Sequence, residues 1–260
     1  MGAQMNTDLK FALELADAAD QKSIERFQAL DLYVETKPDR SPVTDADRSV
    51  ETAIRDLIAE HRPADAIIGE EYGSGGDSER VWIVDPIDGT ANFLRGVPVW
   101  ATLIALREKG EYVLGVVSAP AMGRRWWAAT GEGAFTSEVT GETKKLQVSK
   151  VKNIADASFS FSSIELWDKN GELEKLWKIS RSVWRTRAYG DFWSHMMVAE
   201  GAVDISAESH LKIYDWAAIA PIVREAGGVF RDQAGNLHDQ TSKIMVSNGL
   251  LDAQLSELLS

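Results

Sequence analysis

The most informative segment of the sequence is Trp82-Ile83-Val84-Asp85-Pro86-Ile87-Asp88-Gly89-Thr90. It begins as an apolar run typical of a buried strand, which should end at Asp85, three positions before a second carboxylate, Asp88. Hard cations such as Mg²⁺ prefer carboxylate oxygens. Gly89 lets the backbone come close to a ligand, and Thr90 offers an N–H and a hydroxyl at a helix start. The stretch therefore predicts a metal-and-phosphate cradle, although Asp-Pro and Asp-Gly are also ordinary turn dipeptides.

Acidic residues elsewhere in the chain favour the metal site over the turn. A second apolar run, Ala66 to Gly69, leads directly into Glu70-Glu71. In two-metal sites, ions about 3.5–4 Å apart orient a phosphate ester and activate the attacking water. The sequence therefore predicts hydrolysis of a phosphate ester without a covalent nucleophile. The oxygen ligands for two or three Mg²⁺ ions would come from Glu70, Asp85, Asp88, Asp215 and the carbonyl of Ile87.

Composition excludes several other classes of protein. The net charge of -12 disfavours nucleic acid or an anionic membrane as a partner, because both bind clustered Lys and Arg. The 260 residues include no cysteine, which excludes disulfides and a cysteine nucleophile. The histidines, which show no metal-ligand spacing, are His61, His195, His210 and His238. With no apolar run of about 18 residues and no basic-then-apolar leader, we expect a soluble cytoplasmic protein.

Hydrophobic periodicity predicts mixed helices and strands. Helical spacing is seen over 7–30 and again after Thr44, which can cap a helix that has Asp47 in its first turn. From its local sequence, Asp47 is a favourable charge at a helix N-terminus. The segments 99–106, 112–119 and 125–129 predict an antiparallel meander, while the second half alternates helices and strands. We therefore expect a layered α/β (α+β) fold, in one domain over 1–260 with subdomains 1–148, which carries the metal site, and 149–260, which carries substrate specificity.

Several of these motifs together resemble the inositol monophosphatase family. They are Gly69-Glu70-Glu71, the stretch 82–90 followed by Asn92-Phe93, and Asp215-Trp216-Ala217-Ala218 followed by Glu225-Ala226-Gly227-Gly228. The resemblance implies a layered α-β-α-β-α sandwich of the inositol monophosphatase/fructose-1,6-bisphosphatase type. It also implies Mg²⁺-dependent phosphomonoesterase activity, lithium sensitivity in many members, and usually a homodimer.

The resemblance also implies a role for individual residues. The ligands of a first metal would be Glu70, Asp85 and the Ile87 carbonyl, and those of a second would be Asp85, Asp88 and Asp215. Asp47 and Thr90 match the pair that positions the attacking water, with Glu70 beside them in the catalytic set. Lys37 matches a loop lysine near the active site, and the amides of Gly89 and Thr90 would hold the phosphate.

Three further segments are similar to the histidinol-phosphate phosphatase branch of the family. They are 97–106, 118–127 and Arg187-Ala188-Tyr189-Gly190-Asp191, the last of which lacks the Gly-Ser-Ala-Ala typical of inositol-specific members. Histidinol phosphate carries an ammonium and an imidazole, so its recognition should use acids. The candidates are Asp191 and Glu208, with Arg187 nearby, although ordinary salt bridges are an alternative for all three. Inositol-1-phosphate, a broader range of sugar phosphates, and a non-catalytic metal-binding protein remain alternative functions.

Overall fold

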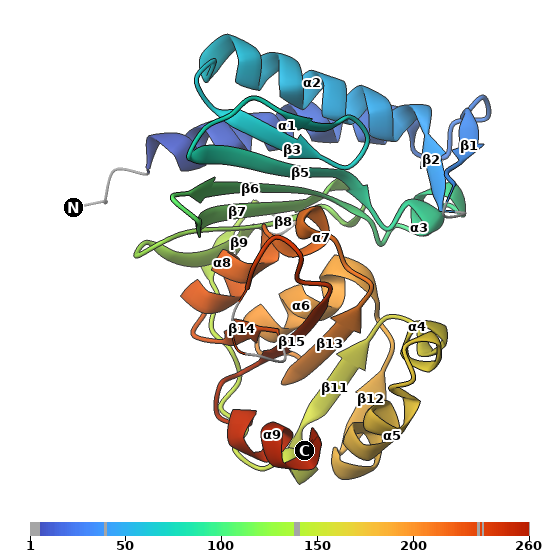
Figure 1. Cartoon of the computed structure of the whole chain (residues 1–260), viewed down its shortest axis with the longest axis vertical. Coiled ribbons are helices and arrows are strands. Elements are labelled where there is room, and N and C mark those ends of the chain that lie inside the picture. The colour runs from blue at the N-terminus through green and yellow to red at the C-terminus, as the bar shows by residue number, and fades with distance from the viewer. Residues whose placement is uncertain (1–5, 39–40, 138–140, 233–234, 236, 260) are drawn as a thin grey trace. The chain divides into compact units, whose positions relative to one another are not determined.

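The computed structural model of the chain describes residues 6–38, 41–137, 141–232, 235 and 237–259. These residues form two compact units (Figure 1). Unit 1 consists of the chain up to Lys144 together with Tyr214–Ile222, and unit 2 consists of Lys145–Ile213 and the chain from Val223 onward. The segment 214–222 therefore belongs to unit 1, although it follows most of unit 2 in sequence. Across the described ranges, no helix combines the length and apolar character needed to cross a membrane.

Unit 1 is built on an eight-stranded sheet. Its strands, in spatial order, are β10 (Thr143–Lys145), β9 (Gly133–Ser137), β8 (Arg124–Ala129), β7 (Glu111–Ala119), β6 (Ala101–Glu108), β5 (Arg80–Asp88), β3 (Ala66–Gly69) and β4 (Gly73–Gly75). From β5 to β9 the pairing is antiparallel, which confirms the predicted meander. Strand β3 pairs in parallel with β5, so both strands end at the same edge of the sheet.

Two long helices, α1 (Thr7–Arg26) and α2 (Asp45–His61), cover one face of this sheet (Figure 1). Their inward stripes, with Leu15 and Ile54 fully buried, pack against strand residues such as Trp82 and Ile104. A two-stranded ribbon, β1 (Val34–Thr36) with β2 (Pro42–Thr44), leads into α2. The short elements of unit 1 are α3 (Thr90–Leu94) and the 3₁₀ turn Pro120–Met122.

The segment 214–222 is held on strand β7. It contains the end of α7 (Ile213–Trp216) and the start of α8 (Ile219–Glu225). Trp216 makes an edge contact with Tyr112, with ring centroids 4.9 Å apart. A Cβ on Gly115 would lie only 2.0 Å from the carbonyl oxygen of Ala218. A glycine at position 115 is therefore required for this segment to lie against the sheet.

Unit 2 is built on a five-stranded mixed sheet. Its order is β12 (Arg185–Arg187), β11 (Ser158–Phe161), β13 (Ile205–Ser209), β15 (Lys243–Ser247) and β14 (Val229–Arg231). Helices α5 (Leu173–Ser182) and α9 (Asp252–Leu259) pack an apolar layer with Phe159 and Ile205 on one face. Helix α6 (Asp191–Ala199) lies against the polar face, where Ser160 and Ser206 point. The remaining elements are α4 (Ile164–Lys169) and the 3₁₀ turn Ile154–Asp156.

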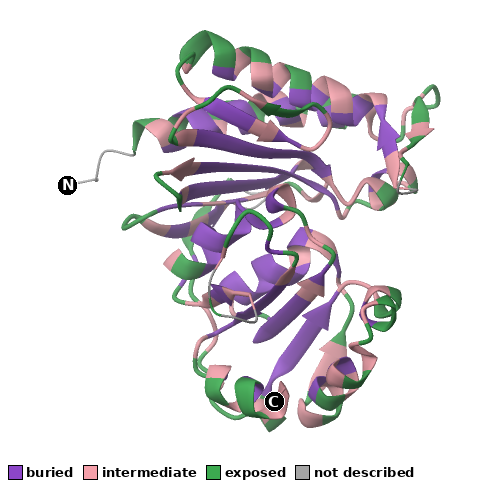
Figure 2. Ribbon diagram, viewed as in Figure 1, coloured by how far each residue is buried: buried purple, intermediate pink, exposed green. Residues whose placement is uncertain are grey.

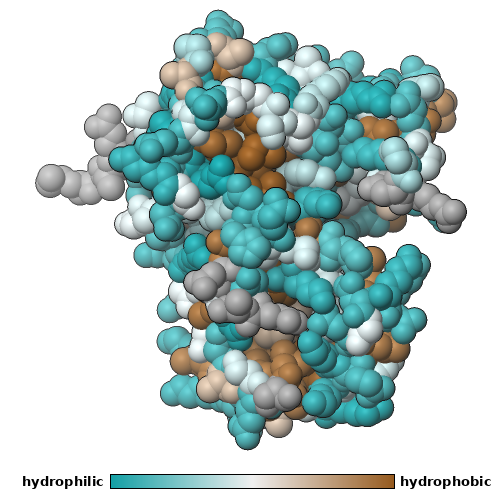
Figure 3. Space-filling view, in the orientation of Figure 1, coloured by the Kyte–Doolittle hydropathy of each residue, from teal (hydrophilic) through white to brown (hydrophobic). Residues whose placement is uncertain are grey.

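Buried residues concentrate on the strands of each sheet and on the helix faces toward them (Figure 2). Hydrophilic side chains dominate the visible surface (Figure 3), in keeping with the high content of charged residues. The predicted layered α/β class is thus confirmed within each unit. One local expectation differs, because the strand expected to end at Asp85 continues to Asp88. The short strand β4 pairs with the otherwise open edge of β3.

Candidate active site

The site begins at an irregularity in strand β5. The pairing of β5 with β6 shifts register between Asp85 and Asp88. Within this bulge the Ile87 N–H donates to Asp85 Oδ1 at 3.0 Å, and the Pro86 carbonyl accepts from the Thr102 hydroxyl at 2.8 Å. Residues three apart in a regular strand face opposite sides of a sheet, whereas a bulge re-aims one of them. The irregularity therefore allows both acids to act at one place.

Four carboxylates from three parts of unit 1 interact there. Burial raises the pKa of Asp85 well above its usual value, and the negative charges of Glu70, Asp88 and Asp215 raise it further. Glu70 arrives beside Asp85 because its N–H donates to the Val84 carbonyl at 3.2 Å, which extends the parallel pairing of β3 with β5. Asp215 is brought by helix α7. Three of the predicted ligand acids are thus within electrostatic range of the fourth, Asp85.

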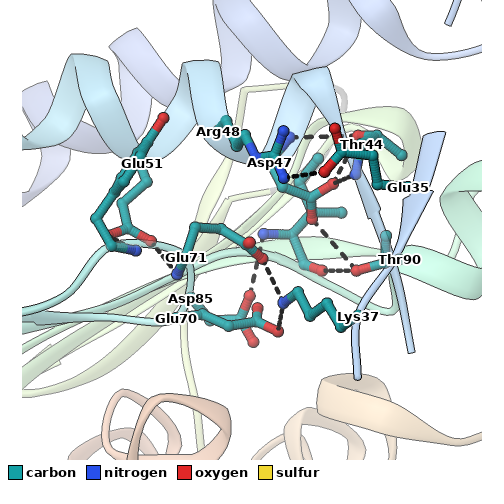
Figure 4. Close-up of polar contacts among 12 residues, drawn as sticks. Glu35, Lys37, Thr44, Asp47, Arg48, Glu51, Glu70, Glu71, Asp85 and Thr90 are labelled. Carbon is teal, nitrogen blue, oxygen red and sulfur yellow. Dashed lines mark hydrogen bonds and ion pairs between the residues drawn. The ribbon is translucent and has the colours of Figure 1, made fainter. Parts of the chain in front are cut away.

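Lys37 places a cation among these acids. Its ammonium lies 2.7 Å from Glu70 Oε1 and 2.6 Å from Glu71 Oε1 (Figure 4). Burial raises the pKa of Glu71 to about 7, against the opposing effect of Lys37. Burial, together with the charges of Glu70 and Asp215 among others, also raises the pKa of Tyr214. Such an excess of negative charge attracts cations strongly.

The donor chemistry of this cluster fits a hard divalent ion. All the groups are carboxylate or carbonyl oxygens, which Mg²⁺ prefers to nitrogen or sulfur. The Lys37 ammonium already occupies a cation position next to Glu70. In the part of the chain that the structure describes, no three His, Cys, Asp or Glu side chains form a complete metal-ligand group. Glu70 and Asp85 nevertheless lie within hydrogen-bonding range of each other, and Asp88 and Asp215 act on Asp85 through their charges.

Thr90 joins this cluster to the start of helix α2. Its hydroxyl lies 3.0 Å from the Ile87 carbonyl and 3.3 Å from Asp47 Oδ1. Asp47 also completes a capping box with Thr44, as its position in the first helical turn predicts. Burial raises the pKa of Asp47 to about 6, hydrogen bonds from Thr44 oppose this rise, and the charge of Glu70 adds to it. Gly89, the N-cap of α3, has φ +83°, which L side chains rarely adopt.

Glu51 supports the site, a role that the sequence analysis above does not assign to it. It is fully buried, and its carboxylate accepts from the backbone N–H groups of Glu71 at 2.7 Å and Tyr72 at 3.2 Å. A Cβ on Gly69 would lie 2.0 Å from Glu51 Oε1, so this glycine makes room for the carboxylate. Arg55 pairs with it from one helical turn away, at 2.8 Å. An acid on the apolar stripe of an amphipathic helix is the signal that could have revealed it.

The three residues predicted to select the substrate, Arg187, Asp191 and Glu208, all lie in unit 2. Arg187 is exposed on β12, and its Nη1 donates to the Thr186 carbonyl at 2.7 Å. Asp191 opens helix α6 with φ +48°, an unusual conformation for a residue other than glycine. Glu208 on β13 lies 3.2 Å from the ring of His195. Unit 2 thus brings Glu208 together with a histidine that sequence analysis assigned no role.

Comparisons with known proteins place the chain. The inositol monophosphatase family model matches residues 4–260. A histidinol-phosphatase of Streptomyces coelicolor is 52% identical over 252 residues, covering 95% of each chain, and one of Mycobacterium tuberculosis is 51% identical over 245 residues, covering 94% of each. The crystal structure of the extragenic suppressor protein suhB of Bartonella henselae matches with a TM-score of 0.89 at 29% identity, over 98% of this chain and 99% of that one. The chain belongs to the inositol monophosphatase family.

Proposed function

We propose that this protein is a Mg²⁺-dependent phosphomonoesterase that hydrolyses L-histidinol phosphate to L-histidinol and phosphate, a step of histidine biosynthesis. One observation carries the proposal: over about 95% of its length the chain is 52% identical to a histidinol-phosphatase. The identity to an inositol-1-monophosphatase of Caulobacter vibrioides is lower, at 32%. The family itself is metal-dependent, in agreement with the acidic cluster of unit 1.

The acids of the cluster divide between two ions in this proposal. Glu70, Asp85 and the Ile87 carbonyl would hold the first ion, and Asp85, Asp88 and Asp215 would hold the second. Support comes from the pKa of Asp85, which burial raises and which the nearby charges of Glu70, Asp88 and Asp215 raise further. When bound, the metal ions would act as Lewis acids that favour ionisation of water and neutralise phosphate charge. A third ion is compatible with the number of acidic groups.

Asp47 and Thr90 position the attacking water. The Thr90 hydroxyl can donate to Asp47, which leaves its oxygen free to accept a proton of that water. With its pKa near 6, Asp47 can share a proton with this hydroxyl at neutral pH. Glu70, near Asp47, contributes to the same catalytic set. The amides of Gly89 and Thr90, at the start of α3, hold the phosphate.

Unit 2 supplies the selectivity for a cationic substrate. Asp191 and Glu208 bind the ammonium and imidazole groups, and Arg187 contacts the ligand or one of these acids. Support comes from the backbone of Asp191, whose φ of +48° is costly and tends to persist where function requires it. We further propose a cytoplasmic homodimer that binds neither nucleic acid nor membrane.

A substrate panel with purified protein tests the function. In the presence of Mg²⁺, kcat/KM for L-histidinol phosphate should exceed that for inositol-1-phosphate and for sugar phosphates by at least about tenfold, which corresponds to roughly 1.4 kcal/mol of selectivity. Comparable values for inositol-1-phosphate would refute the assignment. If no phosphate ester released phosphate, while Mg²⁺ still bound, the chain would be a metal-binding protein without catalytic activity.

A further inference from the structure

His195 is a buried histidine at the centre of a polar relay in unit 2. Its side chain is only 2% exposed. Nδ1 lies 2.8 Å from the hydroxyl of Ser206, and Nε2 lies 3.2 Å from Glu208 Oε2. Ser206 is completely buried. Each ring nitrogen of His195 thus has one polar partner, and one of these partners is an acid proposed to contact the substrate.

The secondary structure explains why these side chains meet. Asp191 and His195 are four residues apart on α6 and therefore lie on one face of the helix. Ser206 and Glu208 are two residues apart on β13 and therefore lie on one face of the sheet. Helix α6 packs against β13. The ring of Phe230 on β14 makes an edge contact with the His195 ring, with centroids 6.4 Å apart.

The positions of the protons on the His195 ring follow from the chemistry of its partner, the Glu208 carboxylate. A carboxylate only accepts hydrogen bonds, so Nε2 must carry a proton directed at Glu208. In the neutral ring Nδ1 then accepts from the Ser206 hydroxyl, and every member has a partner of the right kind. The relay therefore restrains one carboxylate oxygen of Glu208 through two buried groups. Such restraint lowers the cost of ordering Glu208 on binding a ligand.

The start of the same helix is also fixed. The Gly190 N–H donates to Ser194 Oγ at 2.9 Å, and this hydroxyl lies 2.7 Å from Ser160 Oγ on β11. These bonds hold the turn in which Asp191 adopts its unusual backbone conformation. Helix α6 thus carries Asp191 at its first residue and, through His195, orients Glu208. Helix α6 therefore positions both Asp191 and Glu208.

We infer that His195 is a positioning residue for substrate selectivity, which fixes Glu208 to receive the cationic part of an amino-alcohol phosphate. This inference rests on the proposed function. A neutral polyol phosphate would gain little from a restrained carboxylate, whereas an ammonium or imidazolium group forms a charge-assisted hydrogen bond that depends on its direction. His195 acts through Glu208, the partner of its Nε2.

A pair of isosteric variants tests the inference. In His195→Asn the amide can replace Nδ1 next to Ser206 but is too short to reach Glu208, whereas the amide of His195→Gln can reach Glu208 in place of Nε2. The measured quantity is the ratio of kcat/KM for histidinol phosphate to kcat/KM for glycerol 2-phosphate. We expect this ratio to fall about tenfold in His195→Asn, mainly through KM for histidinol phosphate, and to recover in His195→Gln. A ratio taken within one preparation is independent of the folded fraction.

The double variant shows whether the effect passes through Glu208. The ratio in His195→Asn/Glu208→Gln should equal that of Glu208→Gln within about twofold, because coupled residues are not additive. His238→Asn, which changes an exposed histidine of unit 2, serves as the control and should keep the wild-type ratio. A parallel loss for both substrates, an unchanged ratio in His195→Asn, or additive effects would each overturn the inference while the proposed function stands. If wild-type protein showed no preference for histidinol phosphate, the proposed function would fail, and this inference with it.

Discussion

The ammonium of Lys37 lies 2.7 Å from a carboxylate oxygen of Glu70 and bridges it to the neighbouring Glu71. Lys37 comes from the loop after β1, and both acids follow β3. In the proposed mechanism Glu70 is a metal ligand, so Lys37 and the first metal ion compete for the same carboxylate. The charge of Lys37 therefore links the stability of the metal-free protein to its affinity for Mg²⁺.

Replacing this lysine should make the protein more dependent on Mg²⁺. Lys37→Met leaves Glu70 and Glu71 without their cation, and we expect it to destabilise the metal-free protein by about 1 kcal/mol. Added Mg²⁺ should then raise the Tm of the variant more than that of the wild type. Thermal unfolding in EDTA and in Mg²⁺ measures both effects. Lys10→Met, at an exposed position on α1, is the control. Equal Mg²⁺ effects in wild type and Lys37→Met would contradict the competition.

Neutralising Asp215 should separate metal binding from folding. Asp215→Asn removes one charge from the cluster and one proposed ligand of the second ion. We expect kcat/KM to fall by more than about a hundredfold, since loss of outer-sphere partners alone typically costs 10–100-fold. Calorimetry should show weaker Mg²⁺ binding while the Tm in EDTA rises or stays constant, because like-charge repulsion is relieved. Asp56→Asn, on the exposed side of α2, should match the wild type. Full activity of Asp215→Asn would refute its assignment as a ligand.

The Thr90 hydroxyl should matter for turnover more than for binding. Thr90→Val keeps the shape but loses the contacts to Asp47 and the Ile87 carbonyl. We expect kcat to fall by roughly 10²–10⁴, the usual contribution of a positioned proton acceptor or donor, with little change in KM. Thr90→Ser retains the hydroxyl and should recover most of the rate. Steady-state kinetics of the three proteins measures kcat and KM. If Thr90→Ser were as slow as Thr90→Val, the hydroxyl would have no role in turnover.

The packing of the 214–222 segment should be sensitive to one methyl group. Gly115→Ala would place a Cβ 2.0 Å from the Ala218 carbonyl oxygen and must displace the segment that carries Asp215. We expect a loss of about 1–3 kcal/mol in the free energy of unfolding, the range typical of overpacking, and weaker Mg²⁺ binding. In Gly75→Ala the nearest atoms would be at an ordinary 3.6 Å, so this variant is the matched control. Denaturant unfolding measures this loss. If the free energy of unfolding of Gly115→Ala equalled that of the wild type, the segment would be able to shift at no cost.

The buried acids predict how stability depends on pH. Burial raises the pKa of Asp47 from 3.8 to about 6 and that of Glu71 from 4.5 to about 7. Their contribution to the stability of the metal-free protein is therefore fully present below about pH 4 and is lost as the pH rises through 6 to 7. Burial also raises the pKa of Asp85, a proposed ligand. Because Mg²⁺ requires deprotonated ligands, it should raise the Tm more at about pH 8 than at about pH 5.

Unfolding curves with EDTA and with Mg²⁺ at both pH values check this expectation. Asp47→Asn should flatten the decline in stability of the metal-free protein between these pH values, because its amide does not titrate. The exposed Asp56→Asn again provides the comparison. If Mg²⁺ stabilised the protein equally at both pH values, the raised pKa values would not be coupled to metal binding.

Local features of the fold and the family of this protein can be predicted without coordinates. The helix cap at Thr44 and the meander after β5 follow from short-range rules of caps and alternation. The motif around Asp85 and its companions also predicted the family, since residue types at fixed spacing are visible without coordinates. Such features depend on neighbours within a few positions, which is why they can be read from the chain.

Contacts between groups far apart in the sequence could not be predicted in this way. The bulge between Asp85 and Asp88, the pairing of Lys37 with Glu70, and the carboxylate of Glu51 beneath Gly69 each depend on strand register or helix packing. The relay from His195 to Glu208 likewise exists only because α6 packs on β13. Burial and the distances between charges set the pKa values of Asp47 and Asp85, and both arise only when segments far apart in sequence are brought together by folding.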